Sequence, residues 1–140
     1  MFLSNHIFGN PIAEPLRADF TSGRRHEFFI FLVFYHVFIA FLERRPTAKK
    51  RLFTQTEIDY CERFRKAPEE RYAARFAAKC ALRSRVSGLA WHDIVIDNDA
   101  LGAPSLSAVN TLVNVSSVSL SHDKVWSVAA LLLEEAPEPE

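Results

Sequence analysis

The segment RYAARFAAKC (Arg71–Cys80) carries the clearest helical pattern in this chain of 140 residues. An apolar stripe with a spacing of four residues runs through it and consists of Tyr72, Phe76 and Cys80. A second stripe with the same spacing is basic and consists of Arg71, Arg75, Lys79 and Arg83. The two stripes predict an amphipathic helix, whose basic face is either solvated or a surface that binds anions.

Sequence signals mark both ends of this helix, and a separate signal upstream predicts a second helix before it. Pro68 suits the first helical position, and Ser87-Gly88 predicts that the helix stops near Val86. Upstream, Thr54-Gln55-Thr56-Glu57 has the pattern of a capping box, in which a hydroxyl and a carboxylate satisfy free amides at a helix start. This earlier helix should end before Pro68, because a proline disfavours helical backbone in the residue that precedes it.

From Trp91 onward the hydrophobic period changes to two, which predicts strands. The first contains Ile94 and Ile96 and leads into a turn cluster at Asn98–Pro104. Two more strands are expected over residues 113–120 and 126–133, and a short one near His6–Phe8.

An almost unbroken apolar run spans Phe28–Leu42. As a helix its 15 residues would extend roughly 22 Å, whereas a bilayer core needs roughly 20 residues. His36 near its middle adds a further cost to membrane insertion. A buried helix or strand is therefore favoured, and membrane association through this run stays open as the less favoured alternative.

Composition narrows the function classes. The formal net charge is zero, so no global field draws the chain to nucleic acid or to an anionic membrane. The two cysteines, Cys61 and Cys80, belong to no metal-binding or redox motif. The first ten residues lack the pattern of a secretory signal, and a reducing cytoplasm is expected.

Four motifs occur in an order that resembles the bacterial holo-[acyl-carrier-protein] synthases. They are FTQTEIDYC (Phe53–Cys61), RYAARFAAKC, WHDIVIDNDALGAP (Trp91–Pro104) and SVSLSHD (Ser117–Asp123). The resemblance implies an α+β fold of the 4′-phosphopantetheinyl transferase type, with helices packed on a small antiparallel sheet. It also implies transfer of 4′-phosphopantetheine from coenzyme A to a serine of apo acyl carrier protein, as a homotrimer. On this basis the chain is expected to be a single domain, with residues 1–52 divergent, the apolar run as an insertion and residues 134–140 as a frayed tail.

The resemblance also assigns site residues. It implies a catalytic role for Lys79 and contacts with the phosphates of coenzyme A from Arg75, Lys79, Arg83, Ser121 and His122. The family uses Mg²⁺, held by an Asp near the N-terminus and by a Glu in the signature helix. Here Pro11 and Cys80 stand at those two positions, and neither supplies the hard oxygen ligand that magnesium needs.

Three functional readings follow. The first is a divergent holo-[acyl-carrier-protein] synthase, and the second is a non-catalytic relative that still binds coenzyme A or acyl carrier protein. The third is a membrane-associated protein, dominated by Phe28–Leu42. For Cys80 itself, a buried helical cysteine is favoured over a reactive nucleophile, because no His or Asp lies near it in the sequence.

Overall fold

The computed structural model describes residues 16–19, 25–66, 68–109 and 113–135. Its helices are α1 (Tyr35–Arg44), α2 (Ala48–Leu52), α3 (Gln55–Glu62), α4 (Pro68–Arg85) and the short 3₁₀ turn η2 (Trp91–Asp93). Its strands are β1 (Leu16–Asp19), β2 (Arg25–Phe34), β3 (Ile94–Asn98), β4 (Pro104–Ala108), β5 (Val113–His122) and β6 (Trp126–Glu135). The expected strand near His6–Phe8 and the position of Pro11 lie outside the described residues.

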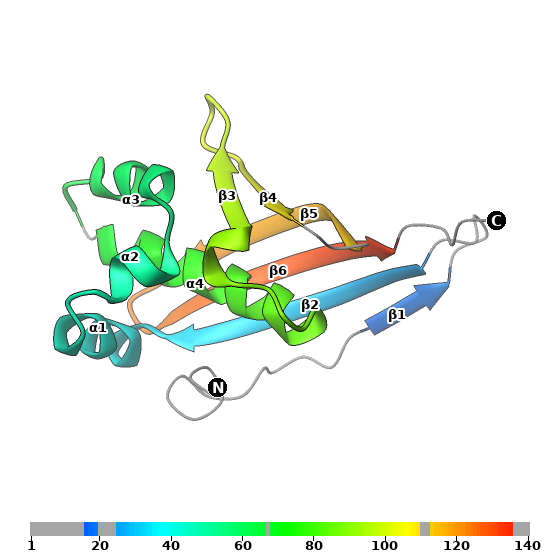
Figure 1. The fold of residues 1–140 in the computed structure, drawn as a ribbon, viewed down its shortest axis with the longest axis horizontal. Coiled ribbons are helices and arrows are strands. Elements are labelled where there is room, and N and C mark those ends of the chain that lie inside the picture. Colours follow the sequence, from blue (N-terminus) through cyan, green and yellow to red (C-terminus); the bar gives the residue numbers. More distant parts are fainter. Residues whose placement is uncertain (1–15, 20–24, 67, 110–112, 136–140) are drawn as a thin grey trace.

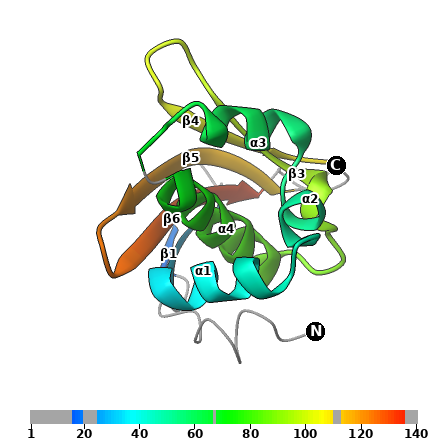
Figure 2. The ribbon, with the colours of Figure 1, turned by 90° about the vertical axis from the view of Figure 1, so that its left-hand side faces the viewer.

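Two antiparallel sheets organise these elements. The larger has the strand order β1-β2-β6-β5, and the smaller is the hairpin β3-β4. The helices lie on one face of the larger sheet, with α4 directly against it and α1, α2 and α3 farther out (Figures 1 and 2). The α+β fold expected from the sequence is confirmed.

The apolar run forms an integral part of this fold. It divides at Phe34 and Tyr35 into the end of β2, which pairs with β6 along nine residues, and the start of α1. The run therefore supplies an interior strand of the larger sheet and most of helix α1. None of the described helices is long and apolar enough to cross a membrane.

Helix α4 is the centre of the core. Every residue from Tyr72 to Leu82 is buried, because the larger sheet covers one side and the outer helices and β3 cover the other. A helix buried on all sides cannot present a solvated stripe. The basic residues of α4 that fall within this segment, Arg75 and Lys79, are therefore interior, which corrects the amphipathic expectation.

Local sequence signals set the helix boundaries as expected. Thr54 accepts a hydrogen bond from the Glu57 amide, and the Glu57 carboxylate accepts one from the Thr54 amide, which completes the capping box. Helix α4 ends at Arg85, and Gly88 follows with φ of 82°, a left-handed conformation that glycine adopts without strain. At the other end of the chain, Glu134 and Glu135 belong to β6, so no frayed tail begins at residue 134.

Candidate functional site

The Arg75 cluster, defined as Tyr60, Arg75 and Asn98, joins α3, α4 and β3. The Arg75 guanidinium donates to the Asn98 side-chain oxygen at 2.7 Å and to the Arg71 carbonyl at 3.2 Å. Its central carbon lies 4.6 Å from the centre of the Tyr60 ring. The Asn98 amide in turn donates to the carbonyl of Gly102, which sits in the β3–β4 turn with φ of 89°.

Among the described residues, no carboxylate pairs with the charge of Arg75. Arg75 is nevertheless only 3% exposed. Its Nε is buried without a hydrogen-bond partner. Burying an uncompensated charge is unfavourable, so this guanidinium is well suited to receive an anion. Around it, Tyr60, Asn98 and Arg71 are half-buried and lead to the surface.

Lys79 lies deeper and has a full set of partners. Its ammonium donates to Glu57 Oε1 at 2.7 Å, to the Leu52 carbonyl at 2.8 Å and to the Trp91 carbonyl at 3.1 Å. Both side chains of the Lys79–Glu57 ion pair are 0% exposed. Burial lowers the pKa of Lys79, and the Glu57 carboxylate opposes that shift. An ammonium whose three donors are all used inside the protein is not available to a coenzyme A phosphate, contrary to the expected role.

His122 and Ser121 do not form one site. His122 lies opposite the buried Ser127 and Ser121 opposite Val128, so their side chains point to opposite faces of the larger sheet. His122 Nδ1 lies 3.0 Å from Glu70 Oε2 in the first turn of α4. This places His122 on the helix-covered face, one helical turn before Arg75, and leaves exposed Ser121 on the other face.

Arg83 is tied to the far end of α4. Its Nε donates to the Leu89 carbonyl at 3.0 Å, and its guanidinium lies 3.9 Å from the centre of the Trp91 ring. Lys79 binds the Trp91 carbonyl, so Arg83 lies beside the Lys79 ion pair and does not join the Arg75 cluster. Of the five predicted phosphate-binding residues, Arg75 alone belongs to the Arg75 cluster, and His122 contacts Glu70, five residues before Arg75 on α4.

The sequence analysis missed three residues of this region. Glu57 was read only as part of a capping box, although its second oxygen reaches β3 and its first reaches Lys79. Asn98 was predicted only as part of a turn, and Glu70 was assigned no functional role. Their positions in the FTQTEIDYC and WHDIVIDNDALGAP motifs marked Glu57 and Asn98 for attention.

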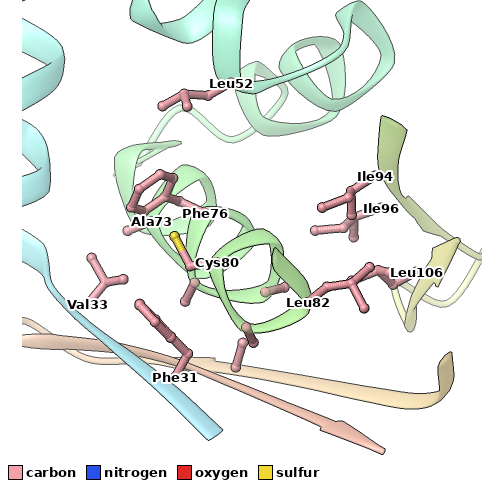
Figure 3. Close-up of a cluster of buried hydrophobic side chains, with 14 of the residues drawn as sticks. Phe31, Val33, Leu52, Ala73, Phe76, Cys80, Leu82, Ile94, Ile96 and Leu106 are labelled. Atoms are coloured by element: carbon pink, nitrogen blue, oxygen red, sulfur yellow. The ribbon is translucent and has the colours of Figure 1, made fainter. Parts of the chain in front are cut away.

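The position that the resemblance assigns to magnesium does not fit a metal. Cys80 is 3% exposed and lies on the side of α4 that faces Phe31 and Val33 of β2 (Figure 3). Burial raises the pKa of its thiol far above the usual value, so the sulfur stays protonated and is a poor ligand for a hard cation. Among the described residues, no group of three or more His, Cys, Asp or Glu side chains could hold a metal ion.

Comparisons with known proteins identify the class of fold and then the family. A solved holo-(acyl-carrier-protein) synthase from Bacillus anthracis, in complex with CoA (3′,5′-ADP), superposes with a TM-score of 0.67 at 27% identity, covering 78% of this chain and 96% of its own. An apo-ACPS structure from "Chronobacterium ammoiniagenes" has a TM-score of 0.69 at 20% identity, covering 81% of this chain and 99% of its own. The fold is thus that of solved holo-[acyl-carrier-protein] synthases.

Curated relatives share the sequence as well. The holo-[acyl-carrier-protein] synthase of Geobacter metallireducens is 41% identical over 112 residues, which cover 69% of this chain and 87% of the relative. That of Geobacter sulfurreducens is 38% identical over 99 residues, covering 61% of this chain and 77% of the relative. No protein-family model matches the chain. With these relatives, the chain belongs to the holo-[acyl-carrier-protein] synthase family, as the sequence motifs indicated.

Proposed function

We propose that this chain transfers 4′-phosphopantetheine from coenzyme A to a serine hydroxyl of apo acyl carrier protein. Membership of the holo-[acyl-carrier-protein] synthase family supports the reaction. The single structural observation that carries the proposal is the Arg75 cluster, in which a buried guanidinium beside Asn98 has no counter-ion among the residues that the structure describes.

In this proposal the chain's own residues bind and orient the nucleotide. Arg75 neutralises a phosphate of coenzyme A through charge-assisted hydrogen bonds, and Asn98 holds the guanidinium in place. His122, oriented by Glu70, faces the same end of α4 and contacts a second phosphate. Lys79, Arg83 and Ser121 stay outside the proposed contacts, because the structure directs them elsewhere.

A homotrimer is the assembly that we propose. The outer face of the larger sheet is free of helices in the described part of the chain, and it exposes three large apolar side chains, Phe28, Ile30 and Phe34, at 40%, 36% and 43%. Apolar side chains on a continuous face suit burial against other copies of the chain. Sedimentation equilibrium tests this assembly, and a monomer at high concentration contradicts it.

The transfer itself is tested with purified protein, coenzyme A and apo acyl carrier protein, using the mass of the carrier protein as readout. The expected result is a mass increase of one phosphopantetheine group with the wild type and its loss with R75M. R51M, which removes an exposed arginine from α2, is the matched control and should keep the activity. Binding of coenzyme A without any transfer contradicts the proposal and identifies a non-catalytic coenzyme A-binding protein. The assay is run with and without added Mg²⁺.

A further inference from the structure

Each residue of the Arg75 cluster lies on the same helix or strand as a residue that belongs to the Lys79–Glu57 ion pair or is bound by it. On α3, Tyr60 follows Glu57 by three residues, and on α4, Arg75 precedes Lys79 by four. Residues at these spacings share one face of a helix. On β3, Asn98 follows Ile96 by two residues, so the two side chains point to the same face of the strand.

The ion pair binds these three elements together. Glu57 Oε1 accepts from the Thr54 amide at 2.7 Å and from Lys79 at 2.7 Å, while Glu57 Oε2 accepts from the Ile96 amide at 2.9 Å. One carboxylate therefore fixes the start of α3, the middle of α4 and the middle of β3. No water has access to it, because both charged side chains are fully buried.

Strand β3 depends on this connection for its placement. Its strand partner is β4, and this hairpin forms a sheet separate from the one on which α4 packs. The Glu57–Ile96 hydrogen bond ties the β3 backbone to the helices, whereas the Arg75–Asn98 contact is one hydrogen bond between two side chains. Without the tie, the distance between Asn98 and Arg75 would rest on that single bond, on apolar packing and on the polar contacts of Trp91 and His92 just before the strand.

We propose that Glu57 and Lys79 are positioning residues for the Arg75 cluster. Their ion pair sets the spacing between the guanidinium, the Asn98 amide and the Tyr60 ring. Through this spacing it sets the affinity of the cluster for a phosphorylated nucleotide, although the ion pair itself does not contact the nucleotide. This inference rests on the proposed function, since it assigns the phosphate of the same substrate to the Arg75 cluster.

The test uses E57Q, which removes the connection to β3 and the negative charge that pairs with Lys79. A glutamine oxygen still accepts from Lys79 and Thr54, but its NH₂ group is a donor and cannot accept from the Ile96 amide. The matched control is E27Q, which weakens the ion pair between buried Glu27 and Arg85 at the other end of α4. Isothermal titration measures the Kd for 3′,5′-ADP, and NMR records the side-chain NH₂ signals of Asn98.

The expected result is a Kd on the order of tenfold higher in E57Q, because small displacements of binding groups are costly, together with shifted Asn98 signals. E27Q should match the wild type in both readouts, and E57D, which keeps two acceptors on a shorter arm, should fall between. If E57Q does not fold, the Kd and the Asn98 signals of E57D are compared with those of the wild type and E27Q instead.

The outcomes separate the two proposals. A folded E57Q with the wild-type Kd and unshifted Asn98 signals overturns the positioning role and leaves the proposed function intact. If the wild type does not bind 3′,5′-ADP, the proposed function fails. The Asn98 signals then decide the positioning role alone: a shift in E57Q but not in E27Q supports it, and no shift overturns it.

Discussion

The two sides of helix α4 are both buried, but they have different chemistry. On the side that faces α3 and β3, Lys79 uses its three donors on Glu57 and two backbone carbonyls. On the side that faces β2, Cys80 lies among aromatic and aliphatic side chains that include Phe31 and Val33 (Figure 3). Adjacent residues in the sequence thus lie in opposite environments.

This difference bears on which part of the family's chemistry the chain has kept. On one side, Arg75 contacts Asn98 and Lys79 pairs with Glu57, and the Arg75 guanidinium suits the binding of a phosphate. On the other side, Cys80 belongs to the hydrophobic core, and no group of three or more His, Cys, Asp or Glu side chains among the described residues could hold a metal ion. The nucleotide contact that we propose for Arg75 therefore uses a buried side of α4, while the expected metal position is part of an apolar cluster.

The largest expected effect comes from placing a charge on the apolar side. C80E restores the carboxylate that the family carries, but here it would be buried beside Phe31 without a partner. We expect the free energy of unfolding to fall by about 5 kcal/mol, from the cost of burying a carboxyl group and from overpacking. Urea denaturation measures this loss, with C80A as control, which should cost roughly 1–2 kcal/mol.

The same variant tests the metal position. If C80E keeps the wild-type stability and added Mg²⁺ raises its midpoint of denaturation, oxygen ligands meet at residue 80 and the apolar assignment is wrong.

Removing the charge on the polar side should have a slightly smaller effect. K79M leaves the buried Glu57 carboxylate without its cation and two carbonyls without a donor. Breaking a buried pair in this way costs about 3–5 kcal/mol. Urea denaturation of K79M, E57Q and the double variant forms a thermodynamic cycle. We expect the double variant to lose less than the sum of the single losses, and strict additivity would show that the two charges are not coupled.

Short-range signals account for the parts of the fold that the sequence predicted. The capping box at Thr54, the proline at residue 68 and the glycine at residue 88 act within one helical turn, so the bounds of α3 and α4 were readable. The apolar run was harder to interpret, because a buried strand and a buried helix have the same composition and little periodicity. Its division at Phe34 depends on pairing with β6, a strand almost a hundred residues later.

The site was less predictable because its contacts are long-range. Arg71, Arg75, Lys79 and Arg83 follow one another at intervals of four residues, so their spacing does not show which of them are buried. The buried Arg75 contacts Asn98, 23 residues away, and the buried Lys79 contacts Glu57, 22 residues away. One feature of the site, the separation of Ser121 from His122, was predictable from the sequence. Successive residues of a strand point to opposite faces, so Ser121 and His122 could have been separated before the structure was known.

The smallest expected effect concerns the two thiols, one on each side of α4, and it appears at alkaline pH. Burial raises the pKa of Cys61 to about 11 from its usual value of 9.0, with Arg75 opposing and Glu57 and Glu62 reinforcing the shift. Cys80 is shifted further in the same direction, by burial in its apolar surroundings, with Arg83 opposing.

Above pH 9 the unfolded chain releases a thiol proton that the folded chain retains, so stability falls as the pH rises towards 11. For Cys61 a difference of two pKa units corresponds to roughly 2–3 kcal/mol at most. Urea denaturation at pH 8, 9 and 10 of the wild type, C61A and C80A should show a flatter pH dependence in each variant. Identical pH profiles in the three proteins would mean that neither thiol is shifted and that both sides of α4 admit water.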